Sequence, residues 1–223
     1  MPTRTARPAA TPLQKSVIDA WRAVPSAIIA DQLNGRGHAD ARIRPIRPFA
    51  PGASLVGSAV TAWCEPADYG PVHHAIALAQ PGDVLVVAAG GRRDAAMIGE
   101  LLGGAARLKG IAGVVVDGAV RDVGTLAQWT DFPVFTRWIT PRGPSSMEQG
   151  SVNEPVVFGD VIVSPLDLVV ADDDGIVFVP HALAQRALDS CLARVEAEKR
   201  WEAALAKGAT TLETFAVPEP MEV

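Results

Sequence analysis

Two short, entirely apolar runs near the middle of the chain constrain its fold more than any other feature. They are VLVVA at 84–88 and VVV at 114–116. Runs of this length and composition are typical of strands buried on both faces, as in parallel sheets covered by helices. Apolar residues at helical spacing fill 95–108, and Gly110 ends that segment. The pattern predicts a β-α-β unit within an α/β fold.

The rest of the chain predicts further helices and strands around this unit. Helices are expected at 13–23, 26–33, 69–78 and 182–206, with Ser26 placed to cap the second. Strands are expected at 54–64, 134–136, 161–163 and 175–179, the last two joined by a tight hairpin turn at Asp174-Gly175. The segment 140–153 is rich in Pro, Gly and Ser and is longer than most loops, so we expect a functional flap there.

Length and composition indicate a single domain. The chain has 223 residues, of which 48% are hydrophobic, and this is enough to close one α/β core. Residues 1–12 are polar and rich in Pro and Ala. We therefore expect a flexible N-terminal arm at 1–12 followed by one domain at 13–223.

Charge, hydropathy and cysteine content argue against several classes of partner. The formal net charge is −5, and the mixed acidic and basic residues offer no basic stripe for a nucleic-acid backbone. No stretch approaches the roughly 18 apolar residues of a membrane span, and the first residues lack the apolar core of a signal peptide. Cys64 and Cys191 are far apart in sequence, which suggests neither a disulfide framework nor a Cys-x-x-Cys zinc site. We expect a cytoplasmic protein that binds neither nucleic acid nor a membrane.

Residues able to carry chemistry concentrate in the β-α-β unit. A helix that begins near Gly99-Glu100 would turn the free N–H groups of its first turn outward, which favours a carboxylate or a phosphate. Asp117, Arg121 and Asp122 follow the second apolar run, at the edge of the sheet where α/β proteins usually bind ligands. Arg121 could grip a carboxylate at two points, while Asp122 holds Mg²⁺ or Mn²⁺ through oxygen. A 2-oxo acid would bind both to Arg121 and to the cation held by Asp122.

The same residues also have purely structural interpretations. An Asp-Gly pair after a strand more often only forms a turn, and an Arg-Asp pair usually lies on a solvent-exposed face. The functional hypothesis therefore rests on the occurrence of these pairs close together within one β-α-β unit. His73 and His74 begin a predicted helix and point about 100° apart, so at most one of them belongs to a site. The acidic run 172–174 lacks the spacing of a calcium loop and favours a hairpin turn.

Several motifs resemble one known family. They are GELL at 99–102 and DGxxRD at 117–122, supported by DxxxxH at 68–73, PGDVLVV at 81–87 and DxDGIVFVP at 172–180. Together they resemble the 4-hydroxy-4-methyl-2-oxoglutarate / 4-carboxy-4-hydroxy-2-oxoadipate aldolases, which share a family with RraA, the regulator of ribonuclease E activity. The resemblance implies an α-β-β-α sandwich with a C-terminal helix, assembled as a homotrimer or a dimer of trimers with active sites between subunits.

The resemblance also implies roles for individual residues. Asp122 would hold Mg²⁺ or Mn²⁺, mostly through waters, and Arg121 would bind the carboxylate and oxo oxygen of the substrate. The backbone of Gly99, Leu101 and Leu102 would bind the pyruvyl carboxylate, Glu100 would move a proton to or from the pyruvate enolate, and Asp117 would support the same polar shell. An acid from the C-terminal helix of a neighbouring subunit, Glu198 or Glu196, would complete the site, and Asp31 is a further candidate for an acidic role.

The implied activity is divalent-metal-dependent aldol cleavage of 4-hydroxy-2-oxo acids to release pyruvate, together with decarboxylation of oxaloacetate. Apart from Lys109 no lysine lies in the cluster, which argues against an imine route. Leu166 and the stretch 69–71 depart from the pattern common in the family, so the substrate contacts can differ. The alternatives are a non-catalytic regulator that binds a protein, and a lyase for another hydroxy acid.

Overall fold

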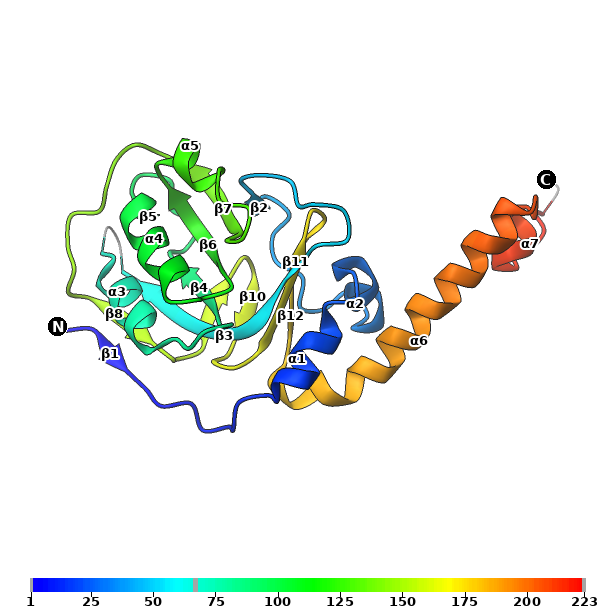
Figure 1. Ribbon diagram of the computed structural model, residues 1–223, viewed down its shortest axis with the longest axis horizontal. Helices are drawn as coiled ribbons and strands as arrows, with labels where there is room; N and C mark the ends of the chain where they lie inside the picture. The colour runs from blue at the N-terminus through cyan, green and yellow to red at the C-terminus, as the bar shows by residue number, and fades with distance from the viewer. Residues whose placement is uncertain (1, 66–67, 222–223) are drawn as a thin grey trace.

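The computed structural model describes residues 2–65 and 68–221, which form helices and strands in stacked layers (Figure 1). Four parallel neighbours make the centre of the main sheet: β3 (Leu55–Cys64), β4 (Val84–Ala88), β6 (Gly113–Val120) and β7 (Val134–Ile139). Three helices connect them in sequence: α3 (Gly70–Leu78), α4 (Glu100–Leu108) and the short α5 (Val123–Leu126). The predicted β-α-β unit is confirmed.

Shorter strands extend the sheet and add a second β layer. β1 (Arg4–Thr5), β8 (Gly150–Val152), β2 (Arg44–Pro45) and β5 (Ala96–Ile98) lie along the main sheet. β11 (Leu168–Asp172) and β12 (Gly175–Val179) form a hairpin that pairs with the first half of β3, and β9 (Val156–Phe158) pairs with β10 (Val161–Val163). β3 is long enough to belong to both layers, since its second half pairs with β4 and β8.

The alternation of side chains along the strands explains the layers. Val114 and Val116 of β6 pack toward α3 and α4, while Val115 between them packs toward β11 and β12. On β11, Val169 points back to that β-β core and Val170 points outward, onto α1 (Lys15–Trp21), α2 (Ser26–Gln32) and the first half of α6 (His181–Ala206). Because strands expose alternate residues on opposite faces, this order gives an α-β-β-α sandwich. The predicted fold class is confirmed.

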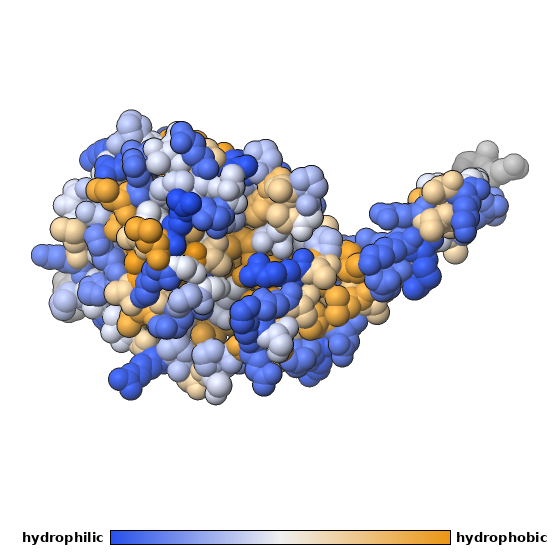
Figure 2. All heavy atoms as spheres, in the orientation of Figure 1, coloured by the Kyte–Doolittle hydropathy of each residue, from blue (hydrophilic) through white to orange (hydrophobic). Residues whose placement is uncertain are grey.

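The C-terminal helix leaves the body of the molecule. Its buried residues end at Cys191, and the rest of α6 projects outward to α7 (Thr211–Phe215), which folds back on it (Figure 1). Trp201 and Phe215 stack edge to face at that end, with ring centroids 5.4 Å apart. Figure 2 shows apolar side chains where α6 leaves the body and mostly polar ones along its projecting part. In the described part of the chain, no helix combines the length and apolar character that crossing a membrane requires.

Three local predictions were wrong. The segment 95–108 is not one helix, because Ala96–Ile98 pair with β6 as strand β5 and α4 begins only at Glu100. Ser26 is not the cap of α2, since Pro25 holds that position and the Ser26 hydroxyl donates instead to Asp172 at 2.6 Å. The strands at 161–163 and 175–179 do not pair with each other, because β11, which the prediction lacked, lies between them and pairs with β12.

Candidate active site

The N-terminus of α4 presents free hydrogen-bond donors. Gly99 precedes the helix in an extended conformation, and the N–H of Glu100, the first helical residue, donates to Oδ2 of Asp122 at 3.0 Å. Among the described residues, none accepts a hydrogen bond from the N–H of Leu101 or Leu102. Such groups carry the positive end of the helix dipole and bind anions.

Arg121 and Asp122 lie at the end of β6, next to that helix start. The N–H of Arg121 donates to the carbonyl oxygen of Ile98 at 2.9 Å, which continues the pairing of β6 with β5. Asp122 then adopts a left-handed conformation, φ 56° and ψ 34°, which turns the chain into α5. This region is uncommon for residues other than glycine, although Asp tolerates it better than most. The turn places the Asp122 carboxylate against α4, with Oδ2 3.6 Å from Nε of Arg121.

Gly99 is required by this close approach. A Cβ atom built at Gly99 would collide with Oδ2 of Asp122 and would lie 2.8 Å from Cγ of Arg121. The backbone conformation at Gly99, with φ −147°, is open to any residue, so contact and not conformation excludes a side chain. The glycine of the GELL motif is therefore part of the geometry of the site.

A pocket of about 130 Å³ lies over these groups. Its lining includes Gly99, Leu101, Leu102 and Arg121, joined by residues of α3, β5 and the 140–153 segment: Tyr69, His73, Ala96, Met97, Ile98 and Pro144. The ring of His73 packs against Tyr69, with ring centroids 4.9 Å apart. The size suits a small acid. As expected, only one of the two adjacent histidines lies here, because His74 lines a different hollow beside Thr3 and Met147.

Asp68 holds the 140–153 segment against α3. Its side chain is almost fully buried, with the residue only 2% exposed, and its carboxylate accepts hydrogen bonds from the N–H groups of Gly70, Glu148 and Gln149 and from the Ser146 hydroxyl. Burial alone would raise the pKa of Asp68, but these four hydrogen bonds outweigh it and hold that pKa below its usual range. The clamp fixes the segment that carries Gly143 and Pro144 past Arg121.

Asp117 is not brought into this cluster. It lies on the same face of β6 as Val115, toward the second β layer, whereas α4 covers the other face. Its buried carboxylate forms an ion pair with Nε of Arg137 at 2.7 Å and accepts the N–H of Gly159 at 3.0 Å. Arg137 also pairs with Asp40 at 2.8 Å. The structure therefore gives Asp117 a role in joining the two β layers.

The other predicted acids are also remote from Arg121 and Asp122 within one chain. Glu198 pairs with Arg194 at 2.9 Å and Glu196 with Lys199 at 2.7 Å, both on the projecting half of α6, and Asp31 is exposed on α2. Glu100, by contrast, begins α4 beside Asp122, with its carboxylate 3.5 Å from the hydroxyl of Thr125 on α5.

The donor set around Asp122 fits a cation that keeps most of its waters. The described residues contain no group of three or more His, Cys, Asp or Glu side chains that could enclose a metal ion. Asp122 is 42% exposed at its side chain, and its second carboxylate oxygen, Oδ1, has no hydrogen-bond partner in the described part of the chain. Mg²⁺ characteristically binds one or two carboxylates and retains several waters, so Asp122 with the neighbouring Glu100 matches its requirements.

Sequence reasoning missed several residues that line the pocket. Met97 and Pro144 have no motif of their own, and only the folded chain brings them to Arg121, whereas Tyr69 belongs to the stretch 69–71, whose departure from the family pattern pointed to altered substrate contacts. The unusual length of the 140–153 segment was the one available signal for Pro144.

Comparison with known proteins identifies relatives of this chain. The family model described as "RraA-like: Aldolase/RraA" matches residues 16–178. A protein of Halalkalibacterium halodurans named "Putative 4-hydroxy-4-methyl-2-oxoglutarate aldolase" is 30% identical over 198 residues, which is 89% of this chain and 92% of that protein. An uncharacterized protein from Pseudomonas syringae superimposes with a TM-score of 0.80 at 29% identity, covering 92% of this chain and 100% of the other.

A second solved structure widens the range of functions found among the relatives. Streptomyces coelicolor RraAS2, described as "an unusual member of the RNase ES inhibitor RraA protein family", superimposes with a TM-score of 0.74 at 28% identity, covering 89% of this chain and 100% of the other. Both the matched family model, which spans most of the chain, and the 30% identity to the first relative lead to one assignment. This chain belongs to the RraA-like family.

Proposed function

We propose that this protein is a divalent-metal-dependent lyase that cleaves 4-hydroxy-2-oxo acids of the 4-hydroxy-4-methyl-2-oxoglutarate type and releases pyruvate. The same site would decarboxylate oxaloacetate. One observation carries the proposal: two free helix N–H groups and a guanidinium belong to residues that line one small pocket, and a carboxylate with an open oxygen, that of Asp122, lies against the same helix start and beside the same guanidinium. The names of curated relatives support it.

The pyruvyl half of the substrate would bind through complementary charge. Its carboxylate would accept hydrogen bonds from the N–H groups of Leu101 and Leu102, where the helix dipole favours a negative charge. Arg121 would contact the carboxylate and the 2-oxo oxygen from the side of β6. Leu101, Leu102 and Met97 would surround the methylene carbon with apolar surface.

Cleavage requires a place for the electrons of the broken carbon-carbon bond. In the aldol substrate a base removes the proton of the C4 hydroxyl, the C4–O bond becomes a carbonyl, and the electrons of the broken C3–C4 bond form the pyruvate enolate. Fixed donors stabilise the negative charge of this enolate far better than water does. Asp122 would hold the Mg²⁺ or Mn²⁺, which supplies positive charge beside the developing enolate oxygen. Glu100 would then deliver a proton to C3. Decarboxylation of oxaloacetate reaches the same enolate, so the same residues serve both reactions.

The proposed site is completed by a second copy of the chain. Glu198 or Glu196 of a neighbouring subunit would lie near the substrate, since the projecting half of α6 that carries both has no contact with Arg121 or Asp122 of its own chain. We propose a homotrimer or a dimer of trimers as the assembly that brings them together.

A non-catalytic role is the second candidate function. It is favoured by one observation, the structural similarity to a member of the RNase ES inhibitor family. The free donors at Leu101 and Leu102 and the open oxygen of Asp122 favour the enzyme, because a protein-binding role makes no use of them.

The direct test is release of pyruvate by the purified protein. Oxaloacetate and 4-hydroxy-4-methyl-2-oxoglutarate are supplied with Mg²⁺ or Mn²⁺, and pyruvate is measured with lactate dehydrogenase and NADH. We expect turnover of both that a chelator abolishes and added metal restores. Absence of turnover with either substrate and either metal would favour the regulator or a lyase for a different hydroxy acid.

A further inference from the structure

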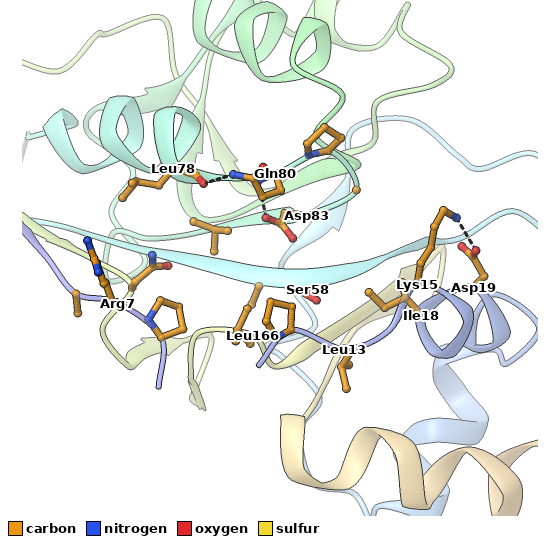
Figure 3. Close-up of a pocket in the computed structure, with 18 of the residues that line it drawn as sticks. Arg7, Leu13, Lys15, Ile18, Asp19, Ser58, Leu78, Gln80, Asp83 and Leu166 are labelled. Atoms are coloured by element: carbon orange, nitrogen blue, oxygen red, sulfur yellow. Dashed lines mark hydrogen bonds and ion pairs between the residues drawn. The ribbon is translucent and has the colours of Figure 1, made fainter. Parts of the chain in front are cut away.

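A second and larger cavity lies away from the candidate active site, between the N-terminal segment and the body. It has a volume of about 500 Å³ and is walled by the segment 6–13, α1, β3 and the turn at 80–83 (Figure 3). We call it the arm cavity. None of its lining residues lines the pocket over Arg121, so it is a separate feature.

The floor of the arm cavity is apolar. Val60 of β3 and Leu166 contribute from the sheet side, and Leu13 and Ile18 from the N-terminal side. Leu78, at the end of α3, remains 46% exposed. A cavity of this volume with an apolar floor is of the size that binds small organic molecules.

The charges around the rim are not balanced. Arg7 extends from the N-terminal segment toward the end of α3 (Figure 3), and no described residue forms an ion pair or a side-chain hydrogen bond with it. At the other end, Lys15 and Arg22 share a single carboxylate, that of Asp19, at 2.5 Å and 3.5 Å. Asp83 is the other acid of the rim, and its carboxylate accepts the N–H of Gln80 at 2.7 Å. Three cations thus face two acids.

The wall that carries Arg7 is attached by few contacts. Strand β1 pairs with β8 through only two residues, Arg4 and Thr5, and the N–H of Ala6 donates to Val152. Arg4 forms an exposed ion pair with Glu154 at 3.1 Å, and exposed pairs contribute little to stability. At its other end, Nε2 of His181 donates to the carbonyl oxygen of Thr11 at 2.9 Å, and residues 7–10 between these two attachments form no hydrogen bond with the described residues.

We propose that the arm cavity binds an amphipathic monoanion, with an apolar body on the floor of Val60, Leu166 and Ile18 and an anionic group at Arg7. The polar groups of Ser58 and Asn153, which also line the cavity, would take further hydrogen bonds.

The test uses decanoate and the fluorescent probe 8-anilinonaphthalene-1-sulfonate with the full chain. Decanoate is expected to bind by calorimetry and to displace the probe, while decyltrimethylammonium, which has the same tail and the opposite charge, is not. Arg7→Ala should weaken decanoate binding about tenfold, as expected for one charge-assisted hydrogen bond, and Arg7→Lys should recover part of the loss. Arg186→Ala, a change of an exposed arginine on α6, is the matched control and should leave binding unchanged.

A second variant tests the contribution of the apolar floor of the arm cavity. Ile18→Asn, at a half-buried position, should also weaken decanoate binding without unfolding the protein. Equal affinity for decanoate in the wild type, Arg7→Ala and Ile18→Asn would overturn the proposal, as would the absence of decanoate binding. Because the readout is binding and not turnover, the result is independent of the proposed lyase activity.

Discussion

The carboxylate of Asp122 accepts a hydrogen bond from the backbone N–H of Glu100, with Oδ2 and the nitrogen 3.0 Å apart. This bond ties the end of β6 to the start of α4 and uses the first free donor of the helix. It leaves the N–H donors of Leu101 and Leu102, two residues that line the pocket, and the other oxygen of Asp122 without a partner among the described residues. The arrangement orients the carboxylate before any ligand arrives, which is what a preorganised anion and cation site requires.

Replacement of Asp122 by alanine is expected to remove lyase activity. The variant loses the proposed cation ligand, whose charge stabilisation amounts to several kcal/mol, so kcat/KM should fall at least about a thousandfold. Alanine tolerates the left-handed conformation at position 122 less well than Asp does, and the N–H of Glu100 loses its acceptor, so the variant should also lose roughly 1–2 kcal/mol of stability while remaining folded. Pyruvate release measures the activity of the variant, and a thermal melt measures its stability. Wild-type turnover by Asp122→Ala at saturating Mg²⁺ would remove Asp122 from the mechanism.

Replacement of Arg121 by alanine is expected to lower kcat/KM by about a hundredfold to a thousandfold, the cost of removing one fixed donor from a developing oxyanion. Arg121→Lys should recover only part of the activity, because an ammonium group lacks the forked geometry of a guanidinium. Arg36→Ala, at an exposed position on the loop after α2, is the control and should keep full activity. Steady-state kinetics with oxaloacetate separate the three variants, and equal rates for all of them would contradict the assignment.

Gly99→Ala should damage the site more than the fold. The added methyl group meets the Asp122 carboxylate and the Arg121 side chain, both of which can move into solvent, so activity should fall while stability is nearly kept. The matched control is Gly104→Ala in the interior of α4, where the new Cβ lies 3.7 Å from Trp129 in ordinary contact. That variant should be active and more stable by about 0.5–1 kcal/mol. Denaturant unfolding and pyruvate release measure both effects, and an active Gly99→Ala would show that the close approach is dispensable.

Asp68 is expected to make stability dependent on acid pH. Its pKa in the folded protein is below the value near 3.9 of an unfolded Asp. Its contribution is therefore fully present above about pH 4 and is lost as the pH falls through the folded pKa. Asp68→Asn should reduce the free energy of unfolding at pH 7 by roughly 1–3 kcal/mol, since the amide keeps only one acceptor oxygen and its NH2 group, itself a donor, faces N–H groups that bonded to the other. It should also weaken the decline of stability between about pH 4 and pH 2.

The control for Asp68 is the exposed Asp189 on α6. Asp189→Asn should unfold at the wild-type denaturant concentration at each pH. If Asp68→Asn shows the same stability and the same pH profile as Asp189→Asn, the clamp on the 140–153 segment makes no net contribution.

Asp117→Asn should behave as a structural variant. The change leaves the buried guanidinium of Arg137 with Asp40 as its one remaining charged partner, and breaking a buried pair typically costs about 3–5 kcal/mol. Activity of the folded fraction should fall far less than in Asp122→Ala. Activity measured at low temperature, with the folded fraction taken from circular dichroism, distinguishes the two. A folded but inactive Asp117→Asn variant would show instead that Asp117 takes part in catalysis.

The two aspartates show what could be predicted from the sequence. The run VVV at 114–116 identified the strand, and the residues after it identified the edge where ligands bind. Asp117 lies within β6 on the face of Val115, whereas Asp122 follows the strand and is turned against α4 by its left-handed conformation. The sequence does not show that β6 extends to Val120, so Asp117 and Asp122 were both expected beside the same bound substrate.

Contacts between distant parts of the chain account for most of what was missed. Asp68 meets residues 78 to 81 positions later, and no local pattern at either end encodes that contact. Strand β11 was missed, and its partners include β3, more than one hundred residues earlier. β5 was hidden inside an apolar pattern that fits a helix and a strand equally well, a known ambiguity for short apolar runs.

The exchange of the pyruvate methyl protons for deuterium tests the central claim most directly, because it requires only the pyruvyl half of the substrate. Pyruvate is incubated in D₂O with the protein and Mg²⁺ or Mn²⁺, and the methyl signal is followed by proton NMR. The proposed site predicts loss of that signal well above the rate with metal alone, and no such loss with a chelator present or in Asp122→Ala. Exchange no faster than with metal alone, at protein concentrations comparable to pyruvate, would contradict enolate formation at this site.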